Sequence, residues 1–484
     1  MSPATPEIAR SEAHALVEVT AHDEPALLSI DGIDLAGALE QQLFFALRDD
    51  APAIARRAGS PQAAVAVARL AAAAAVSLGS WQVPIAGPAP IVVLVRDPTH
   101  YPVIERLRDR LRRESVPLAM VRTGRAAAGA PPHGMVAPRL VRLVDPRGIP
   151  ALAAFQARVL ARAGNAGRSW REVVGQQRAA ETMTVARLEL GRIALGAVAL
   201  GGLVRRWRPG LLVAFDEIGT WARLLPAVAH RFDVPSLDLP HAEATDAWAI
   251  QGAGYDRMAV YGSRAAAVLG EAGVGAERIV EIGAPRFDPL FAASATSASP
   301  DRRRRVVYAA QYVTGSMTSQ LLALCLRRAM AVAGAATPAE LVIVRHPADP
   351  RTFRMDVDAP AGVEVRVAAG DGLHRELTGA WAMVTGWSNS VYEAAIAGVP
   401  SITVAPRGTS PVDFAADGLA IAAGDEASAV KAARSLLDPA IHLEAVARAR
   451  ALLPERLGSL DGRSTERAAR LVLELAGVRR AGHA

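Results

Sequence analysis

The stretch 384–400 holds the residue pattern in this chain that is best suited to binding a charged group. Ser388, Asn389 and Ser390 follow an apolar, strand-like run and precede a short apolar helix that Gly398 would end. Hydroxyl, amide and unbonded backbone N–H groups at the positive end of a helix stabilise an anion. The pattern therefore predicts a phosphate-binding turn.

A purely structural interpretation of the same turn stays open. Ser390 is followed three residues later by Glu393, which is the spacing of a capping box that starts a helix without any ligand. The two interpretations differ in what Ser390 bonds, which is either a phosphate oxygen or the backbone of its own helix.

A second candidate group for phosphate lies at the end of the predicted strand 341–344. His346 can donate a hydrogen bond to phosphate in its neutral or its protonated form, and Arg345 beside it would add a fixed cation. Alternation along the strand would turn these two side chains to opposite faces. The alternative for His346 is a strand-end histidine that caps the turn before Pro347. Gln311, after the first strand of the same region, could reach the same phosphate or serve only as a turn residue.

Residues at two further strand ends could act as a general base. Asp216 and Glu217 follow one apolar run and, being adjacent, at most one of them projects toward a substrate; His241 follows the next run. The alternatives are an acidic N-cap for the helix that comes next and a solvated loop histidine. His100 and His133 have no matching partner in the sequence, so we expect them on the surface.

Length and composition describe a globular chain of roughly two to three domains, with 484 residues, 51% of them hydrophobic and 21% charged. The net charge of +6 is modest because 54 basic residues are nearly balanced by 48 acidic ones, so no nucleic-acid partner is implied. Cys325 is the only cysteine, which excludes an intrachain disulfide and a cysteine-based zinc site and fits a reducing cytosol.

The sequence also carries information on localisation. Residues 1–22 include acidic side chains and no apolar core, unlike a secretion signal. The most apolar windows, 63–78 and 193–204, are interrupted by Arg69 or too short to cross a bilayer. We therefore expect a cytoplasmic protein, with peripheral attachment to the inner face of the membrane as the alternative.

The elements that must position these residues alternate between buried strands and helices, in two successive blocks. The predicted regions are a helical accessory region with its clearest helix at 62–78, two Rossmann-like domains and a tail, at 1–85, 86–290, 301–470 and 471–484. Such alternation predicts an α/β fold with two doubly wound parallel sheets, whose ligands bind outside the carboxyl ends of the strands. Two facing sheets would place their site in the cleft between them.

Taken together, these residues resemble the GT-B glycosyltransferase superfamily, in particular bacterial surface-polysaccharide enzymes of the sialyltransferase-like type. The resemblance covers about residues 86–475, and its motifs on the donor side are 345–347 and 385–390 with Glu393 and 398–400. The non-hydrolysing UDP-N-acetylglucosamine 2-epimerases share this architecture and are similar around His241 to Ala244.

The sequence departs from both family patterns in one place each. The epimerase-like run continues with glycine, leucine and arginine, where this chain has Thr245, Asp246 and Ala247. In the sialyltransferase-like acidic motif glycine directly follows two acidic residues, whereas here Ile218 intervenes before Gly219. The first departure weakens the epimerase interpretation, and the second weakens the assignment of the base.

The resemblance implies a donor site and a base. The residues concerned are Arg345, His346, Ser388, Asn389, Ser390 and Gln311 for the nucleotide phosphate, Glu393 for the ribose, and Asp216, Glu217 or His241 for the base. It implies inverting transfer of a sugar, such as a CMP-linked nonulosonate or Kdo-like acid, from a CMP-, UDP- or CDP-linked donor to a glycan, lipid-linked or protein acceptor. No metal or other cofactor is expected if the protein supplies the positive charge. A 2-epimerase and an inactive GT-B scaffold that binds a partner remain as alternatives.

Overall fold

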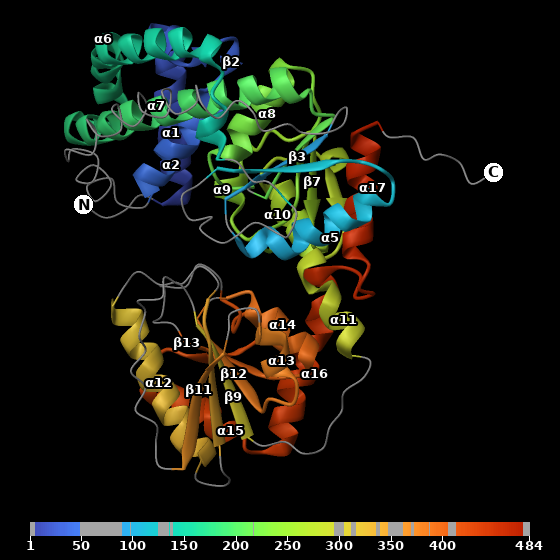
Figure 1. Cartoon of the computed structure of the whole chain (residues 1–484). Helices are drawn as coiled ribbons and strands as arrows, with labels where there is room; N and C mark the ends of the chain where they lie inside the picture. The colour runs from blue at the N-terminus through green and yellow to red at the C-terminus, as the bar shows by residue number, and fades with distance from the viewer. Residues whose placement is uncertain are drawn as a thin grey trace. The chain divides into compact units, whose positions relative to one another are not determined.

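The computed structural model of the chain describes most of its residues. Those described are 5–48, 90–96, 98–123, 135, 139–215, 217–294, 304–310, 316–334, 339–346, 362–368, 372–386, 388–404 and 413–477. They form two compact units (Figure 1). The first unit takes its residues from Met1–Val260, Ala265–Glu281 and Glu466–Ala484, and the second from Tyr261–Arg264 and Ile282–Thr465.

The first unit is built on a 6-stranded parallel sheet with the strand order β4-β3-β5-β6-β7-β8. The strands are β3 (Ile91–Val95), β4 (Leu118–Arg122), β5 (Leu211–Ala214), β6 (Ser236–Asp238), β7 (Arg257–Val260) and β8 (Ile279–Glu281). The order reverses between β3 and β5, because β4 lies on one side of β3 and all later strands lie on the other. Ligands of doubly wound folds bind beside such a reversal, outside the carboxyl ends of the strands.

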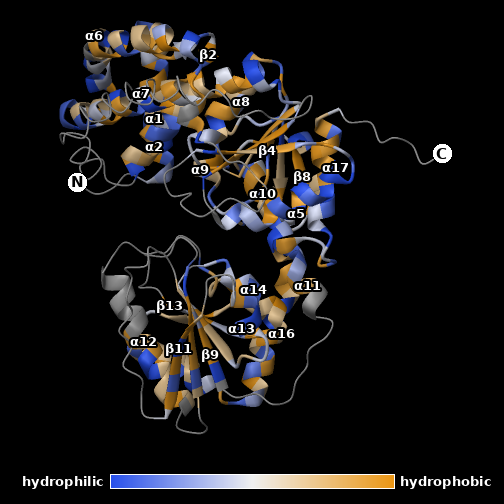
Figure 2. Ribbon diagram, viewed as in Figure 1, coloured by the Kyte–Doolittle hydropathy of each residue, from blue (hydrophilic) through white to orange (hydrophobic). Residues whose placement is uncertain are grey.

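Burial on both faces explains the apolar strands. All residues of β3 are buried, as expected for a parallel strand that helices cover on both sides. Figure 2 shows the strands of both sheets largely in the hydrophobic colours. The helices that accompany the first sheet are α5 (Tyr101–Arg112), α8 (Trp221–Arg231), α9 (Ala247–Ile250), α10 (Ser263–Glu271) and α17 (Ser464–Leu475).

A group of helices and a small hairpin packs against this sheet within the first unit (Figure 1). Its elements are α1 (Pro6–Asp23), β1 (Ser29–Ile30), β2 (Ile33–Asp34), α2 (Ala36–Arg48), α6 (Ile149–Val174) and α7 (Gln176–Trp207). The chain turns between α6 and α7 at Gly175, whose φ of +80° is readily adopted only by glycine. The buried indole of Trp170 donates to the hydroxyl of Thr20 at 3.0 Å and so ties α6 to α1. The predicted helix at 62–78 lies outside the described residues.

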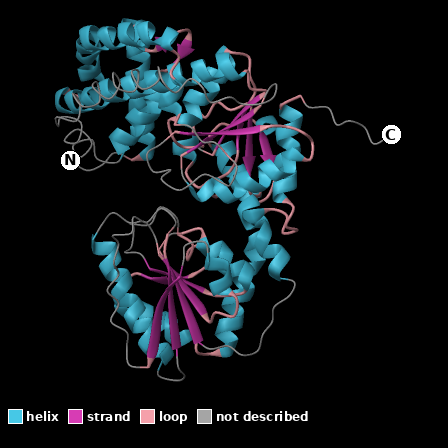
Figure 3. Cartoon of the chain, in the orientation of Figure 1, coloured by secondary structure: helices cyan, strands magenta, loops and turns pink. Residues whose placement is uncertain are grey.

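The second unit has its own 6-stranded parallel sheet, with the order β11-β10-β9-β12-β13-β14 (Figure 3). The strands are β9 (Arg304–Ala309), β10 (Ala339–Val344), β11 (Val363–Ala368), β12 (Ala382–Thr385), β13 (Ser401–Val404) and β14 (Ile421–Ala423). The helices are α11 (Asp288–Ser294), α12 (Ser316–Gly334), α13 (Leu373–Leu377), α14 (Ser390–Ala397), α15 (Glu426–Ser435) and α16 (Pro439–Leu457). The order reverses between β9 and β12.

Alternating side chains of β9 fill the cores on the two faces of this sheet. Val307 and Ala309 pack into one hydrophobic cluster, and Val306 and Tyr308 pack into the other. A strand buried in this way reads as a continuous apolar run in the sequence. Two parallel sheets flanked by helices confirm the predicted α/β fold with two doubly wound units.

The boundary expected at residue 470 falls inside α17. Residues from Glu466 onward belong to the first unit and not to the second.

Within the ranges that the structure describes, no helix combines the length and the apolar character needed to span a bilayer.

Candidate functional site

Glu217 and His241 form a hydrogen-bonded pair at the carboxyl edge of the first sheet. Nδ1 of His241 lies 2.8 Å from Oε2 of Glu217. The Glu217 side chain is buried, and that of His241 is half-buried. The two residues follow β5 and β6, which are neighbouring strands, so the sheet brings together side chains that are separated by a whole helix in the sequence.

The electrostatics of this pair favour an ionised carboxylate. Burial alone would raise the pKa of Glu217, but the charge that the His241 ring carries when protonated and the hydrogen bond between the two outweigh burial, so that the pKa is lowered. An ionised carboxylate can only accept, so Nδ1 of His241 carries the proton of this bond. Nε2 is then the basic nitrogen of the neutral ring. The arrangement is that of a histidine base held by a carboxylate.

His100 belongs to the same group, so the expectation that it lies on the surface is wrong. Its ring is 8% exposed and stacks on Phe215 with the ring centroids 4.8 Å apart. The centroid of the His241 ring lies 5.9 Å away. His100 ends the turn after β3 and Phe215 follows β5, so both strands beside the reversal of the sheet contribute. This contact was not predictable from the sequence, because Phe215 and His241 are distant from His100 along the chain. His133 lies outside the described residues.

The other acidic candidate cannot be placed in the same way, because Asp216 lies outside the described residues. The alternative of an acidic N-cap does not apply to Glu217. The N-cap of α8 is Thr220, which makes no capping bond with its side chain, and the carboxylate of Glu217 is bonded to His241.

In the second unit, the turn 388–390 lies directly after β12 at the start of α14, beside the reversal of the sheet. Ser388 and Asn389 are partly exposed. The N-cap Asn389 makes no capping bond with its side chain, and the N–H of Ser390 donates to Oγ of Ser388 at 3.3 Å. Oγ of Ser390 is buried and has no hydrogen-bond partner among the described residues. A buried hydroxyl left without a partner is unfavourable, and an incoming acceptor would satisfy it.

The carboxyl end of α14 is compensated by the protein itself. Gly398 ends the helix with a φ of +72°, in the left-handed region. The guanidinium of Arg450 on α16 donates to the carbonyls of Ala395 and Ile396, at 3.2 Å each. A cation at this end of a helix offsets the negative pole of its dipole. At the amino end, Oγ of Ser388 accepts from the N–H of Ser390, and Glu393 lies in the first turn.

Glu393 does not form the capping box that the sequence left open. Its carboxylate is 2% exposed, and Oε1 accepts from Nη2 of Arg286 at 3.0 Å. Nδ1 of His374 lies 3.6 Å from Oε2. The helix begins at Ser390 with Asn389 as its cap, so the register of the box is lost. Arg286 and His374 were not identified as partners from the sequence, because neither is a local neighbour of Glu393.

The remaining donor-side candidates follow β10, at the same edge of the second sheet. Arg345 is exposed and His346 is partly buried. β9 separates β10 from β12, so the two strand ends lie about 10 Å apart at the usual strand spacing. Gln311 lies outside the described residues. Across the described ranges, no three His, Cys, Asp or Glu side chains gather closely enough to hold a metal ion.

The architecture is that of the GT-B class, and solved structures of similar fold exist. The S. aureus protein MnaA, solved with UDP, aligns with a TM-score of 0.52 and 11% identity over 81% of this chain and 98% of its own. The UDP-GlcNAc 2-epimerase of Methanocaldococcus jannaschii, solved with UDP-GlcNAc and UDP, aligns with a TM-score of 0.50 and 10% identity over 80% of this chain and 100% of its own. At these identities the similarity concerns the fold. No protein-family model matches the sequence, and no curated protein sequence matches it.

Proposed function

We propose that this protein is an inverting glycosyltransferase that uses a nucleotide sugar. The observation that carries the proposal is the bond between the buried carboxylate of Glu217 and Nδ1 of His241, at the carboxyl edge of the first sheet. A hydroxyl acceptor needs a base as it attacks, and a histidine held by a carboxylate supplies one.

The chemistry divides between the two units. Nε2 of His241 takes the proton of the acceptor hydroxyl while the hydroxyl oxygen forms a bond to the anomeric carbon from the face opposite the nucleotide. The bond from that carbon to the phosphate oxygen breaks, and the nucleotide leaves with the electron pair. The N–H groups and hydroxyls of residues 388–390, with His346 and Arg345, bind the phosphate as its charge grows. No step in this scheme needs a metal.

The donor is proposed to be a CMP-linked sugar acid of the nonulosonate or Kdo type. The support is the resemblance of residues 345–347 and 385–390 to sialyltransferase-like and Kdo-transferase-like enzymes. The buried hydroxyl of Ser390, which has no partner among the described residues, supports a phosphate at this turn for any of the three nucleotides. Acceptors remain a glycan, a lipid-linked sugar or a protein.

A 2-epimerase acting on UDP-N-acetylglucosamine is the second candidate, favoured by the fold that this chain shares with the M. jannaschii epimerase. The segment after His241 counts against it. Asp246 accepts from the N–H of Ala249 at 2.9 Å as the N-cap of α9 and pairs with Arg48 at 2.8 Å. Asp246 therefore has a structural role, at the position where the epimerase-like pattern has leucine.

Nuclear magnetic resonance can separate the candidates in one experiment. The protein is incubated with CMP-, UDP- and CDP-linked sugars, with and without a glycan acceptor and with EDTA in a parallel series. We expect release of free nucleotide that depends on the acceptor and is unchanged by EDTA. Conversion of UDP-N-acetylglucosamine to its manno epimer without an acceptor would instead establish the epimerase. Absence of calorimetric binding to CMP, UDP and CDP would leave only the inactive scaffold.

A further inference from the structure

Gln41 is a polar residue in a position that packing alone would fill with an apolar one. It lies on α2 between Leu39 and Leu43, and all three side chains are 0% exposed. Burying an amide in a hydrophobic helix contact is unfavourable unless its hydrogen bonds are satisfied. The bonds of Gln41 should therefore show why the chain carries an amide here.

Those bonds reach the two loops that follow β5 and β6, at the edge of the sheet where Glu217 and His241 lie. The second loop includes the short helix α9. Nε2 of Gln41 donates to the carbonyl of Ile218 at 2.5 Å and to the carbonyl of Ala249 at 3.0 Å. Oε1 accepts from Nη2 of Arg10 on α1 at 3.1 Å. Arginine can only donate, so this contact fixes which end of the amide faces the loops.

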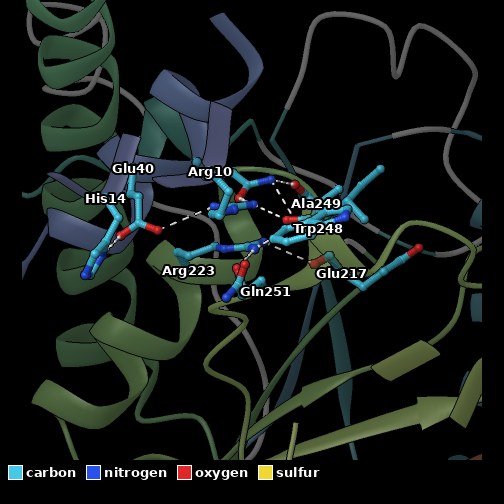
Figure 4. A network of polar contacts seen from close by, with 10 residues as sticks. Arg10, His14, Glu40, Glu217, Arg223, Trp248, Ala249 and Gln251 are labelled. Atoms are coloured by element: carbon cyan, nitrogen blue, oxygen red, sulfur yellow. Dashed lines mark hydrogen bonds and ion pairs between the residues drawn. The ribbon is translucent and has the colours of Figure 1, made fainter. Parts of the chain in front are cut away.

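Arg223, at the start of α8, holds the same two loops from the other side. Its buried guanidinium donates to the carbonyl of Glu217 itself at 3.2 Å, to that of Ala249 at 2.8 Å and to that of Gln251 at 2.5 Å. Figure 4 shows Arg223 and Arg10 converging on this stretch of backbone, where Arg10 also donates to the carbonyl of Trp248. Gln41 and Arg223 thus both donate to the carbonyl of Ala249.

The two loops are those that carry the pair. One holds Glu217 and Ile218, and the other runs from His241 to α9, which contains Ala249. Loop carbonyls in a buried position are unfavourable without donors, so removing these side chains would release the loops and not merely weaken a contact. The distance of 2.8 Å between Nδ1 of His241 and Oε2 of Glu217 depends on the positions of these two loops.

We propose that α2 and α8 position the Glu217–His241 pair, with Gln41 and Arg223 as the positioning residues. The N-terminal helix α2 therefore supports the site of the first unit, although neither residue needs to touch a substrate. The inference rests on the proposed function for its catalytic meaning, because a base that shifts by about 1 Å can lose on the order of 100-fold in rate.

The test uses Gln41→Leu, which keeps the approximate volume of the side chain and removes its donors. The pH titration of the His241 imidazole is followed by 15N NMR in the ligand-free full chain. A nearby carboxylate stabilises the protonated ring, so loss of the fixed geometry should move the titration midpoint lower by roughly 0.5 to 1. Gln41→Met, which also fills the site without a donor or a charge, should move it in the same direction. Either variant serves if the other does not fold.

Glu12→Gln is the matched control. Glu12 pairs with Arg178 at 2.8 Å, which ties α1 to α7, and this pair involves no residue of either loop. In Glu12→Gln, the titration midpoint of His241 should match that of the unaltered protein. An unchanged midpoint in folded Gln41→Leu or Gln41→Met, or an equal change in Glu12→Gln, overturns the positioning role. Turnover is a separate readout, because a changed midpoint without any nucleotide-sugar turnover would disprove the proposed function and leave the positioning role standing.

Discussion

The carboxyl edges of the two sheets use different chemistry at equivalent places. Beside the reversal of the first sheet, the side chains are titratable, with Glu217 bonded to His241 at 2.8 Å and the ring of His100 beside that of His241. Beside the reversal of the second sheet, the turn 388–390 presents hydroxyls, an amide and the amino end of α14. The first edge can change its protonation state, whereas the turn offers dipoles of fixed direction.

This difference shows that two units with similar topology can serve different functions. A group that moves a proton must titrate near the working pH, and a group that holds a phosphate gains from being permanently oriented. Substitutions at the two edges should therefore fail in different ways, one in turnover and the other in affinity.

The largest effect is expected at the first edge. Glu217→Gln keeps the shape of the side chain but removes the charge that supports His241, and His241→Gln removes the base. Each should reduce turnover by about 100- to 10,000-fold, the usual contribution of general base catalysis, while nucleotide affinity by calorimetry stays nearly constant. His230→Asn, on an exposed histidine of α8, is the control and should retain full turnover. Full activity of Glu217→Gln would remove the pair from the mechanism.

The second effect, of intermediate size, concerns the turn 388–390. Ser390→Ala should weaken nucleotide binding by about 1 to 3 kcal/mol, the scale of a hydrogen bond to a charged group. The ligand-free protein should not lose stability, because the substitution removes a buried hydroxyl that has no partner among the described residues. Calorimetric titration with CMP and thermal unfolding measure the two quantities.

Ser401→Ala provides the matched control for this experiment. The Ser401 hydroxyl is also buried and without a partner in the described part of the chain, but it starts β13 and so lies at the opposite edge of the same sheet. Nucleotide affinity should be unchanged. If both serine variants bind CMP equally well, the turn is a structural cap and the donor site lies elsewhere. Ser388→Ala and His346→Ala should also weaken CMP binding.

The smallest effect is on stability as a function of pH. The pKa of Glu217 is lowered in the folded protein, so the carboxylate contributes stability that is present above the ordinary glutamate value of about 4.3 and is lost as the pH falls through the folded value. The difference in unfolding midpoint between the unaltered protein and Glu217→Gln should therefore shrink on acidification below about pH 4. Urea unfolding between about pH 3 and 7 checks the sign. A difference that grows in acid would contradict the charge pairing.

Local patterns in the sequence were sufficient for the two parallel sheets. The predicted strand 341–344, for example, is present within β10. Parallel strands covered on both faces need apolar side chains at successive positions, so the pattern carries the structure directly. The position of Ser388 to Ser390 after a strand was predictable for the same reason.

Contacts between distant segments were not predictable. His100 was expected on the surface because nothing near it in the sequence resembles a partner, and only the sheet brings Phe215 and His241 to it. Glu393 was interpreted from a spacing of three residues, while its actual partner Arg286 lies 107 residues away. Gln41 gave no signal at all, since a glutamine in an amphipathic helix is ordinarily a solvent-facing residue. The roles of Asp216 and Gln311 stay predictions.

The short helix α14 links residues 398 and 450 to the turn 388–390 at its other end. A β-carbon at Gly398 would lie 2.6 Å from the guanidinium of Arg450, besides requiring an unfavourable φ, so any larger residue there would push this arginine off the last carbonyls of the helix. The two poles of so short a segment act on one another through a continuous chain of hydrogen-bonded peptides. A substitution at residue 398 or 450 would thus act along the helix axis. In a protein that carries such a substitution, the affinity for anions at the amino end of α14 should be lower.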